Sequence, residues 1–475
     1  MSDPSVPRTA IAWHLPGLAP GAAESGAWHA GRSAAGTGFR APQLDPPAAA
    51  AVASTVRRAA LEARGRLSAG DVVERVAAAA CRLADPNDPV GRSAVELLRT
   101  ELGWSSRGAA ETLDGMAGGW SADALRSLLR AELGDPGVLD GFRADPTRPD
   151  RRRRASGPPL IFEVLAGNVP GVAVTGAIRG LLVRSGVLAK VAEDEPGLLP
   201  LFARALAEED PLLGRCLAVT WWPGAQSGVS PAWTIWTKQA GKVVVYGGDS
   251  AISEVRATTP ADTEIVAYGP RLGAAVFLAD APGEAAAGLA RDLCSYDQRG
   301  CVSPRVAWVV GADPVATAKR IGAALAAEVD RVAPPPPGEA EAVELRTVRA
   351  EAAFAGFAPG GRDAAVLGPD DLAWTVIARR GPGTEARALP RALWVYGVER
   401  VSDVLELLAP FAGRLQALGY AGDRGLDELA EGAARLGVSR IAPIGSLAWP
   451  PVDWRHEGRH QLLPLLDWTD LELGP

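Results

Sequence analysis

From residue 160 onward, short apolar runs alternate with stretches of helical periodicity, and this alternation limits the possible folds more than any other feature. The runs predicted to be strands are residues 160–166, 187–192, 217–222, 242–247 and 263–269. The stretches predicted to be helices are residues 172–186, 197–210, 230–240 and 250–259. Strands that are apolar along nearly their whole length and separated by helices are typical of a parallel sheet covered on both faces. We therefore predict an α/β fold that binds its ligands at the carboxyl ends of the strands.

The rest of the chain is organised around this sheet. Residues 1–45 are rich in Gly, Ala and Pro without a clear period, so we expect a segment that is loosely ordered or lies as a strap along the surface. The arginine run 151–154 is interpreted as a solvated part of a polar linker that precedes the sheet. The further predicted parts are a helical region with its linker over 46–157, the sheet-bearing cofactor domain over 158–266, a second α/β domain over 267–440, and a C-terminal segment over 441–475 that packs on the body or on a partner subunit.

Charge and composition exclude several classes of protein. The net charge of −7 argues against nucleic-acid binding, which requires a basic face. The longest uncharged apolar stretch, residues 164–178, is broken by Asn168 and Pro170 and is too short to cross a membrane. Four cysteines without CxxC spacing and only four histidines argue against a metal site. Because the N-terminus also lacks the pattern of a secretory signal, we expect a cytoplasmic protein with free thiols.

Two positions at the carboxyl ends of the predicted strands carry polar side chains suited to a functional site. Asn168 lies in the turn 167–171, where its side-chain amide can donate to an oxyanion, although Asn-x-Pro-Gly is also ordinary turn chemistry. Lys190 ends the second strand and is one of only four lysines in the chain. Its ammonium suits a ribose hydroxyl or a phosphate, and a lysine that merely extends from a strand end fits the spacing equally well.

Cys301 is the candidate nucleophile. It follows a glycine and leads into a predicted strand, so a ligand can approach its sulfur and its backbone N–H can stabilise an oxyanion. Most free cysteines are buried structural residues. Cys81, Cys216 and Cys294 fit that description better, because they lie within helical or strand patterns.

Five features, in this order, resemble the aldehyde dehydrogenase superfamily. They are an Asn-x-Pro loop at Asn168, a Lys-x-x-Glu at Lys190 and Glu193, a Pro-Gly turn at Pro223 and Gly224, a glycine turn at Gly247 and Gly248, and the cysteine at Cys301. The sequences IFEVLAGNVPG, SYDQRGCVSPR and DWRHEGRHQLLPLLDWTDLE are similar to one branch, the long-chain acyl-CoA (acyl-protein thioester) reductases, which include the reductase subunit of bacterial luminescence systems. The resemblance implies a Rossmann-type cofactor domain, a catalytic α/β domain and an N-terminal helical region.

The resemblance also implies roles for individual residues. Cys301 would be the nucleophile and Asn168 an oxyanion donor. The residues that would bind the cofactor are Lys190, Glu193, Pro223, Gly224, Gly247, Gly248 and Gly269. His456 is our candidate proton donor, because His14 and His29 lie in the N-terminal segment; the alternative is an exposed loop histidine. No metal ligand is expected.

Two segments depart from the superfamily pattern. Residues 267–270 align with a Glu-Leu-Gly-Gly that supplies a general base, and residues 394–397 align with a Glu-x-Phe-Gly that holds the nicotinamide ribose, but neither contains a carboxylate here. Without the first, water attack on a thioacyl-enzyme is poorly assisted. Without the second, the cofactor is held more loosely. Both departures favour thioester reduction over oxidation of an aldehyde to an acid.

The implied activity is the NAD(P)H-dependent reduction of an acyl thioester to an aldehyde through a thioacyl-enzyme on Cys301. We expect NADPH, with NADH as the alternative because Glu193 would repel a 2′-phosphate. The implied partners are an acyl-CoA or acyl-carrier substrate, an acyl-activating or acyl-transfer protein, and further copies of the chain. Two other functions stay open, namely an oxidative NAD-dependent aldehyde or semialdehyde dehydrogenase and a non-catalytic acyl-handling subunit of a complex.

Overall fold

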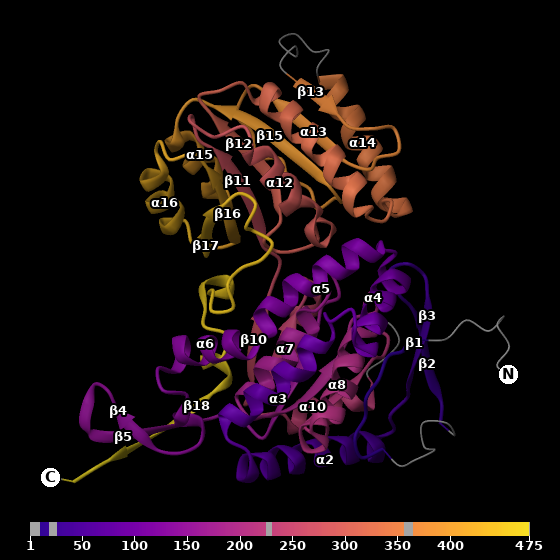
Figure 1. Ribbon diagram of the computed structural model, residues 1–475, viewed down its shortest axis with the longest axis vertical. Helices are drawn as coiled ribbons and strands as arrows, with labels where there is room; N and C mark the ends of the chain where they lie inside the picture. The colour runs from indigo at the N-terminus through magenta and orange to yellow at the C-terminus, as the bar shows by residue number, and fades with distance from the viewer. Residues whose placement is uncertain (1–9, 19–25, 225–229, 356–363, 475) are drawn as a thin grey trace. The chain divides into compact units, whose positions relative to one another are not determined.

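The chain forms two compact units in a computed structural model that describes residues 10–18, 26–224, 230–355 and 364–474 (Figure 1). Unit 1 comprises Met1–Gly269, Pro451–Asp453 and His460–Pro475, and unit 2 comprises Pro270–Pro450 and Trp454–Arg459. The C-terminal part of the chain therefore contributes to both units.

Unit 1 is built on a five-stranded sheet in which every neighbouring pair is parallel, in the order β10-β9-β6-β7-β8. The strands are β6 (Leu160–Val164), β7 (Gly186–Lys190), β8 (Leu217–Thr220), β9 (Lys242–Tyr246) and β10 (Glu264–Tyr268). The connecting helices are α7 (Val172–Leu182), α8 (Leu198–Glu209), α9 (Pro211–Gly214), α10 (Pro231–Gln239) and α11 (Asp249–Thr258). The predicted parallel α/β fold is confirmed.

Both faces of this sheet are buried, as the continuous apolar strands predict. Among the described residues, the α-helices that precede it are α2 (Pro46–Arg66), α3 (Ala69–Arg82), α4 (Pro89–Leu102), α5 (Ser106–Trp120) and α6 (Ala122–Leu133). Leu160 and Phe162 pack in one apolar cluster with residues of α2 and α10. Ile161 packs in another with residues of α3, α7 and α8. Successive residues of a strand point to opposite faces, so the helical region and the sheet share their hydrophobic cores.

The expectation of a loosely ordered segment over residues 1–45 is wrong for its described part. β1 (Ala10–Ile11), β2 (Trp28–Arg32) and β3 (Gly38–Pro42) form a three-stranded sheet. Phe39 and Ala41 alternate along β3 and are buried, and the ring of Phe39 lies 4.8 Å from that of Trp221. His14 pairs with Val219, and its Nε2 lies 3.0 Å from the carbonyl oxygen of Gly214. Because this segment is rich in Gly and Ala, its sequence shows little of the alternation between apolar and polar residues that predicts a strand.

The arginine run is also a strand, not a solvated linker. β4 (Arg143–Asp145), β5 (Arg148–Ser156) and β18 (Asp467–Glu472) form an antiparallel sheet. Arg151 donates from Nε to Asp145 at 2.7 Å and forms an ion pair with Asp470 of β18 at 3.2 Å. The guanidinium of Arg153 lies over the ring of Trp468, at 5.3 Å. Neighbouring strands thus supply the acidic and aromatic partners that let β5 carry four consecutive arginines.

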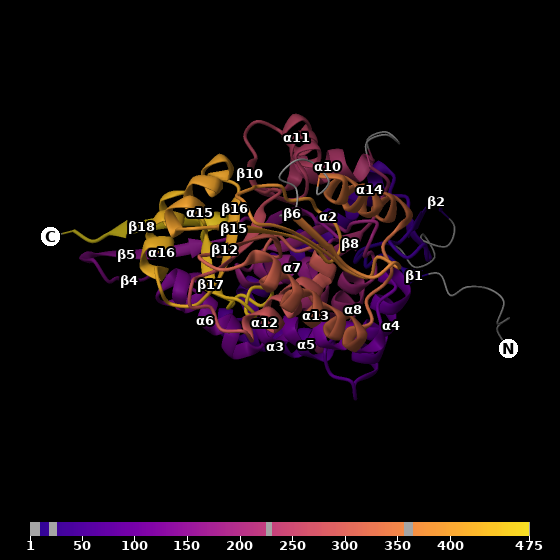
Figure 2. The same cartoon turned by 90° about the horizontal axis from the view of Figure 1, so that it is seen from above.

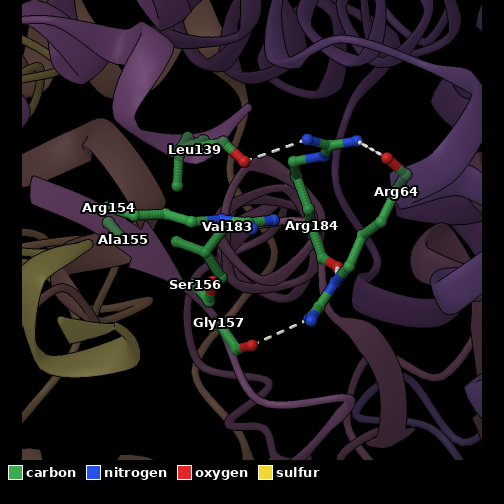
Figure 3. A pocket seen from close by; sticks show the side chains of 8 residues that line it. All are labelled: Arg64, Leu139, Arg154, Ala155, Ser156, Gly157, Val183 and Arg184. Carbon is green, nitrogen blue, oxygen red and sulfur yellow. Dashed lines mark hydrogen bonds between the residues drawn. The ribbon is translucent and has the colours of Figure 1, made fainter. Parts of the chain in front are cut away.

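A small cavity lies at the amino ends of β6 and β7 (Figure 3). Its lining residues are Arg64, Leu139, Arg154, Ala155, Ser156, Gly157, Val183 and Arg184. Arg64 donates to the carbonyl oxygen of Gly157 at 2.8 Å, and Arg184 donates to that of Leu139 at 3.0 Å. The volume of about 30 Å³ holds about two water molecules. This cavity therefore lies where several chain segments meet, at the amino ends of the strands. A ligand is expected at the opposite end of the sheet.

Unit 2 contains a seven-stranded sheet in the order β13-β14-β15-β12-β11-β16-β17, parallel except where β13 pairs with β14. Strands β12, β15, β16 and β17 of this sheet are labelled in Figure 2. Its strands are β11 (Leu272–Phe277), β12 (Pro304–Val310), β13 (Ala364–Leu367), β14 (Thr375–Arg379), β15 (Ala392–Val398), β16 (Leu415–Ala421) and β17 (Arg440–Pro443). Its helices are α12 (Ala285–Cys294), α13 (Pro314–Val332), α14 (Glu339–Ala355), α15 (Val401–Leu408) and α16 (Leu426–Arg435). Apolar clusters lie on both faces, so this unit is a second α/β layer structure.

Candidate active site

In unit 1 the residues predicted to bind a cofactor follow the carboxyl ends of the parallel strands. The strand ends are level, because Lys190 of β7 pairs with Val164 of β6 and with Thr220 of β8. At this edge lie Lys190 and Glu193 after β7, Pro223 and Gly224 after β8, Gly247 and Gly248 after β9, and Gly269 after β10. Parallel α/β sheets bind nucleotides at this edge.

Lys190 is the cation at the strand ends. Its Nζ lies 5.7 Å from the ring centroid of Trp222. Burial lowers the pKa of Lys190, while the negative charges of Glu254 and Glu193 oppose that shift. Glu254 lies on α11, the helix that follows the glycine turn. Because the ammonium is shielded from water, a hydroxyl or phosphate placed beside it would interact with it more strongly than in solvent.

The glycine turn leaves room for a ligand at the start of α11. Gly248 is the N-cap of this helix, and no side chain caps it. A Cβ atom at Gly248 would meet no atom within 4 Å, whereas one at Gly247 would lie 3.1 Å from Cβ of Ala251. An uncapped helix N-terminus behind an open glycine suits a phosphate group. The residues at this edge therefore fit a dinucleotide.

The turn that carries Asn168 is fixed by close packing. The side chain of Asn168 is exposed. Gly171 is the N-cap of α7 and has a φ of +82°. A Cβ atom at Gly171 would lie 3.0 Å from the ring of Trp120, so both the backbone and the available space require glycine. A Cβ atom at Gly167 would lie 2.9 Å from Cβ of Ala192, in the loop that follows β7. The Asn168 turn and the Lys190 loop are thus packed against each other.

Two buried carboxyl groups, which the sequence did not reveal as functional, support these loops. Glu101 accepts from the backbone N–H of Gly197 at 3.2 Å, and Glu195 accepts from that of Leu198 at 3.0 Å and also from that of Gly171. Burial raises the pKa of each to about 8, and Glu101 adds to the shift of Glu195. The one sequence signal was the position of Glu101 within the apolar stripe of α4, three residues after Leu98.

We expect these two carboxyl groups to make stability fall as pH rises. Each pKa is raised in the folded protein, from 4.5 to about 8, so the stabilisation is present below 4.5 and is lost as pH rises through 8. The slope is about 1.4 kcal/mol per pH unit for each group between those values. In urea denaturation, Glu195→Gln should reduce the slope and be more stable than the wild type above pH 8. Glu193→Gln, at an exposed site, is the control; equal slopes for the wild type and Glu195→Gln would contradict the prediction.

In unit 2 a tightly fixed turn carries Cys301. This turn follows the short helix η3 (Ser295–Gln298). Three consecutive residues of η3, Tyr296, Asp297 and Gln298, have φ between 54° and 59°. Gln298 donates to the carbonyl oxygens of Pro304 and Ala392, at 2.6 and 2.7 Å, and accepts from the N–H of Ala392 at 2.8 Å. A Cβ atom at Gly273 of β11 would lie 2.5 Å from the carbonyl oxygen of Ser303. Strained backbone persists where the surroundings fix it, and such positions cluster at functional sites.

The structure brings two of the predicted catalytic residues together. Cys301 Sγ lies 3.7 Å from His456 Nε2, across 155 residues of sequence. The ring of His456 lies 5.1 Å from that of Trp454. His456 is half-buried in the short helix η6 (His456–Gly458), so it is not an exposed loop histidine. Asn168 and the predicted cofactor residues belong to unit 1, and Cys301 and His456 belong to unit 2.

The thiol of Cys301 needs a base before it can act as a nucleophile. Burial raises its pKa to about 11, and the negative charge of Glu457 adds to this. Its own backbone N–H and the charges of Arg271 and Arg305 oppose the shift. The thiol is therefore protonated at neutral pH, and the imidazole 3.7 Å away is placed to accept its proton.

A second loop of unit 2 is anchored beside the Cys301 turn by residues that the sequence did not single out. Asp292 of α12 accepts from the N–H groups of Gly445, Leu447 and Ala448, at 2.6, 2.9 and 3.4 Å. The hydroxyl of Tyr296 donates to the carbonyl oxygen of Ala448 at 2.9 Å. These contacts join segments about 150 residues apart, and spacing alone does not predict them.

Within residues 10–18, 26–224, 230–355 and 364–474, no three His, Cys, Asp or Glu side chains gather as a metal site would require. The helices in the same ranges include none with both the length and the apolar character needed to cross a membrane.

The fold is that of the aldehyde dehydrogenases. The NAD-dependent benzaldehyde dehydrogenase from Corynebacterium glutamicum is similar with a TM-score of 0.69 and 14% identity, over 99% of this chain and 100% of that one. The betaine aldehyde dehydrogenase from Staphylococcus aureus, solved in complex with NAD⁺, is similar with a TM-score of 0.66 and 14% identity, over 92% of this chain and 90% of that one. At such identities the likeness establishes the fold alone.

Sequence comparison places the chain more narrowly. The family model described as acyl-CoA reductase (LuxC) matches residues 66–468, and the chain belongs to this family. The long-chain acyl-protein thioester reductase of Aliivibrio fischeri is 26% identical, over 74% of this chain and 72% of that protein. The protein of the same name from Vibrio harveyi is 24% identical, over 68% of this chain and 66% of that protein. The resemblance found in the sequence is confirmed.

Proposed function

We propose that this protein reduces an acyl thioester to an aldehyde through a thioacyl-enzyme on Cys301. The observation that carries the proposal is the 3.7 Å contact between the sulfur of Cys301 and Nε2 of His456. Membership of the acyl-CoA reductase family supports it. So do the names of the relatives, which are long-chain acyl-protein thioester reductases.

The first chemical step transfers the acyl group to Cys301. His456 accepts the thiol proton as the sulfur attacks the thioester carbonyl, and the backbone N–H of Cys301 and the side-chain amide of Asn168 donate to the oxyanion. The carbonyl then re-forms, and the bond to the sulfur of the CoA or carrier breaks. The imidazolium of His456 returns the proton to the departing thiolate. The products are a thioacyl-enzyme and a free thiol.

The second step releases the aldehyde. Lys190 and the turn at Gly247 and Gly248 would hold the nicotinamide cofactor, which would supply the hydride for reduction of the thioacyl carbon. The backbone N–H of Cys301 and the amide of Asn168 again hold the negative oxygen. As the aldehyde carbonyl forms, the carbon–sulfur bond breaks and Cys301 leaves as the thiolate, which takes up a proton. The whole reaction consumes one proton and one hydride for each thioester.

The chain disfavours hydrolysis of the thioacyl-enzyme. The segments that would carry the two superfamily carboxylates hold aromatic residues instead, Tyr268 in one and Trp394 and Tyr396 in the other. All three are buried, with at most 5% of their surface exposed. The first segment therefore lacks the superfamily base that would activate water, and the second lacks the carboxylate that would hold the nicotinamide ribose.

For the cofactor we propose NADPH, with NADH as the alternative. Lys190 and the turn at Gly247 and Gly248 would hold its ribose and phosphates. Glu193 and Glu254 place negative charge near Lys190 and would oppose a 2′-phosphate, so the ratio of kcat/KM for the two cofactors must be measured. The acyl donor is a CoA thioester, an acyl carrier or an acyl-transfer protein, and we expect the chain to assemble with further copies of itself.

The proposal predicts oxidation of NADPH or NADH by the wild-type protein with acyl-CoAs, together with release of one aldehyde per cofactor. A panel from short to long chains, followed by absorbance and by chromatography of the aldehyde, tests this. Oxidation of aldehydes with NAD⁺ in the absence of a thiol acceptor, without thioester reduction, would instead support an oxidative dehydrogenase. Cofactor binding without turnover or acylation would support a non-catalytic acyl-handling subunit.

A further inference from the structure

The turn that carries His456 is held by a buried carboxylate. Glu457 follows His456 directly and has a φ of 54°. Its side chain is only 2% exposed, and it forms ion pairs with Arg271 and, at 2.9 Å, with Arg459. A left-handed conformation is unfavourable for glutamate, so the surroundings must fix it. The two arginines supply that constraint.

Arg271 connects this turn to the strand that supports Cys301. It directly precedes β11, and it also donates to the carbonyl oxygen of Gly413. Two residues further, Gly273 lies so close to the Cys301 turn that an added Cβ atom would be 2.5 Å from the carbonyl oxygen of Ser303. One end of β11 therefore touches both the turn of the nucleophile and, through Arg271, the turn of the histidine.

From this arrangement we infer that Glu457 and Arg271 are positioning residues whose ion pair holds the imidazole of His456 against the sulfur of Cys301. The inference rests on the proposed function, because it assigns His456 as the base for Cys301. Neither residue needs to touch the substrate. If the ion pair is lost, the turn loses its anchor to β11 and the imidazole is no longer held within proton-transfer distance of the thiol.

Electrostatics provides a test that separates positioning from charge. The negative charge of Glu457 raises the pKa of Cys301, and the positive charge of Arg271 lowers it. If the two residues acted through charge alone, Glu457→Gln would make the thiol more reactive and Arg271→Gln would make it less reactive. If they position His456, both variants lose reactivity. The other charged and titratable groups facing the thiol, Arg305 and Tyr296, are unchanged in each variant.

The experiment measures alkylation of Cys301 by iodoacetamide across neutral to alkaline pH, using intact mass and peptide mapping. We expect Glu457→Gln and Arg271→Gln each to slow alkylation near neutral pH toward the rate of His456→Ala, and kcat to fall about 10²-fold, at the lower end of the range for general acid–base catalysis. The double variant should be no slower than either single variant, because both remove one ion pair. Arg271→Lys should restore part of the rate.

The control is Glu431→Gln, the same substitution on the exposed surface of α16 in unit 2. Thermal unfolding shows whether each variant is folded, and Arg271→Lys keeps the test informative if Arg271→Gln is not. Alkylation of Glu457→Gln at or above the wild-type rate would overturn the inference. If His456→Ala also alkylates like the wild type, the base assigned in the proposed function fails as well; if only His456→Ala is slow, the positioning role alone fails.

Discussion

Replacing Cys301 with alanine is expected to abolish both acylation of the protein and thioester reduction. The mechanism requires a sulfur that forms and then releases a thioester, and a methyl group can do neither. Removing a nucleophile from such a site typically lowers kcat by more than about 10⁴-fold. Cofactor oxidation with the best acyl-CoA, and intact mass after incubation with acyl-CoA in the absence of cofactor, measure the two losses. The wild type should gain the mass of one acyl group and the variant none.

Cys294→Ala is the matched control for this substitution. Cys294 is the last residue of α12, seven positions before Cys301, and burial raises its pKa to about 12. It differs from Cys301 in that, among the described residues, no imidazole lies within hydrogen-bond distance of its sulfur. We expect Cys294→Ala to retain acylation and turnover. An acyl adduct that persists in Cys301→Ala and disappears in Cys294→Ala would show that Cys294 is the nucleophile and would contradict the proposed mechanism.

The parts of the fold that the sequence predicted are those governed by local pattern. The runs 160–166 and 242–247 became β6 and β9, and apart from Glu163 and Lys242 they are nearly all apolar, as a strand buried on both faces requires. The edge of the sheet that carries Lys190 followed from the same pattern, because parallel strands end together. In contrast, β5 was missed because its four arginines become compatible with a strand only beside β18, more than 300 residues away in the chain.

In the candidate site, too, some residues were predicted from their neighbours in the sequence and others became evident only from contacts in the folded protein. Cys301 and Asn168 were found from their neighbours in the sequence and from the family resemblance, and their roles stay predictions. His456 was chosen because His14 and His29 lie in the N-terminal segment, and no spacing rule indicated that it would lie beside a cysteine 155 residues earlier. No neighbouring residues in the sequence indicated a role for Glu457 or Arg271, because the effect of an Arg–Glu ion pair depends on its burial in the folded protein. Positioning residues of this kind become visible only in a structure.

Replacing Asn168 with alanine is the second change with a large expected effect. If its amide donates to the oxyanion in both chemical steps, its removal lowers kcat by about 10²–10³-fold, because the stabilisation exists only as the negative oxygen forms. KM should change little, and the mass adduct should still form, but with a single-turnover acylation rate reduced by the same factor. Close packing at Gly167 and Gly171 holds the backbone of this turn in both proteins.

Asn87→Ala provides the control, because Asn87 lies in an exposed turn before α4 and should leave both rates unchanged. Stopped-flow acylation and steady-state reduction should be measured on both variants at one pH. An Asn168→Ala protein that keeps its kcat while its KM rises would show that the amide binds the substrate in its ground state. The backbone N–H of Cys301 would then be left as the donor to the oxyanion, and the catalytic role of the Asn-x-Pro turn would be lost.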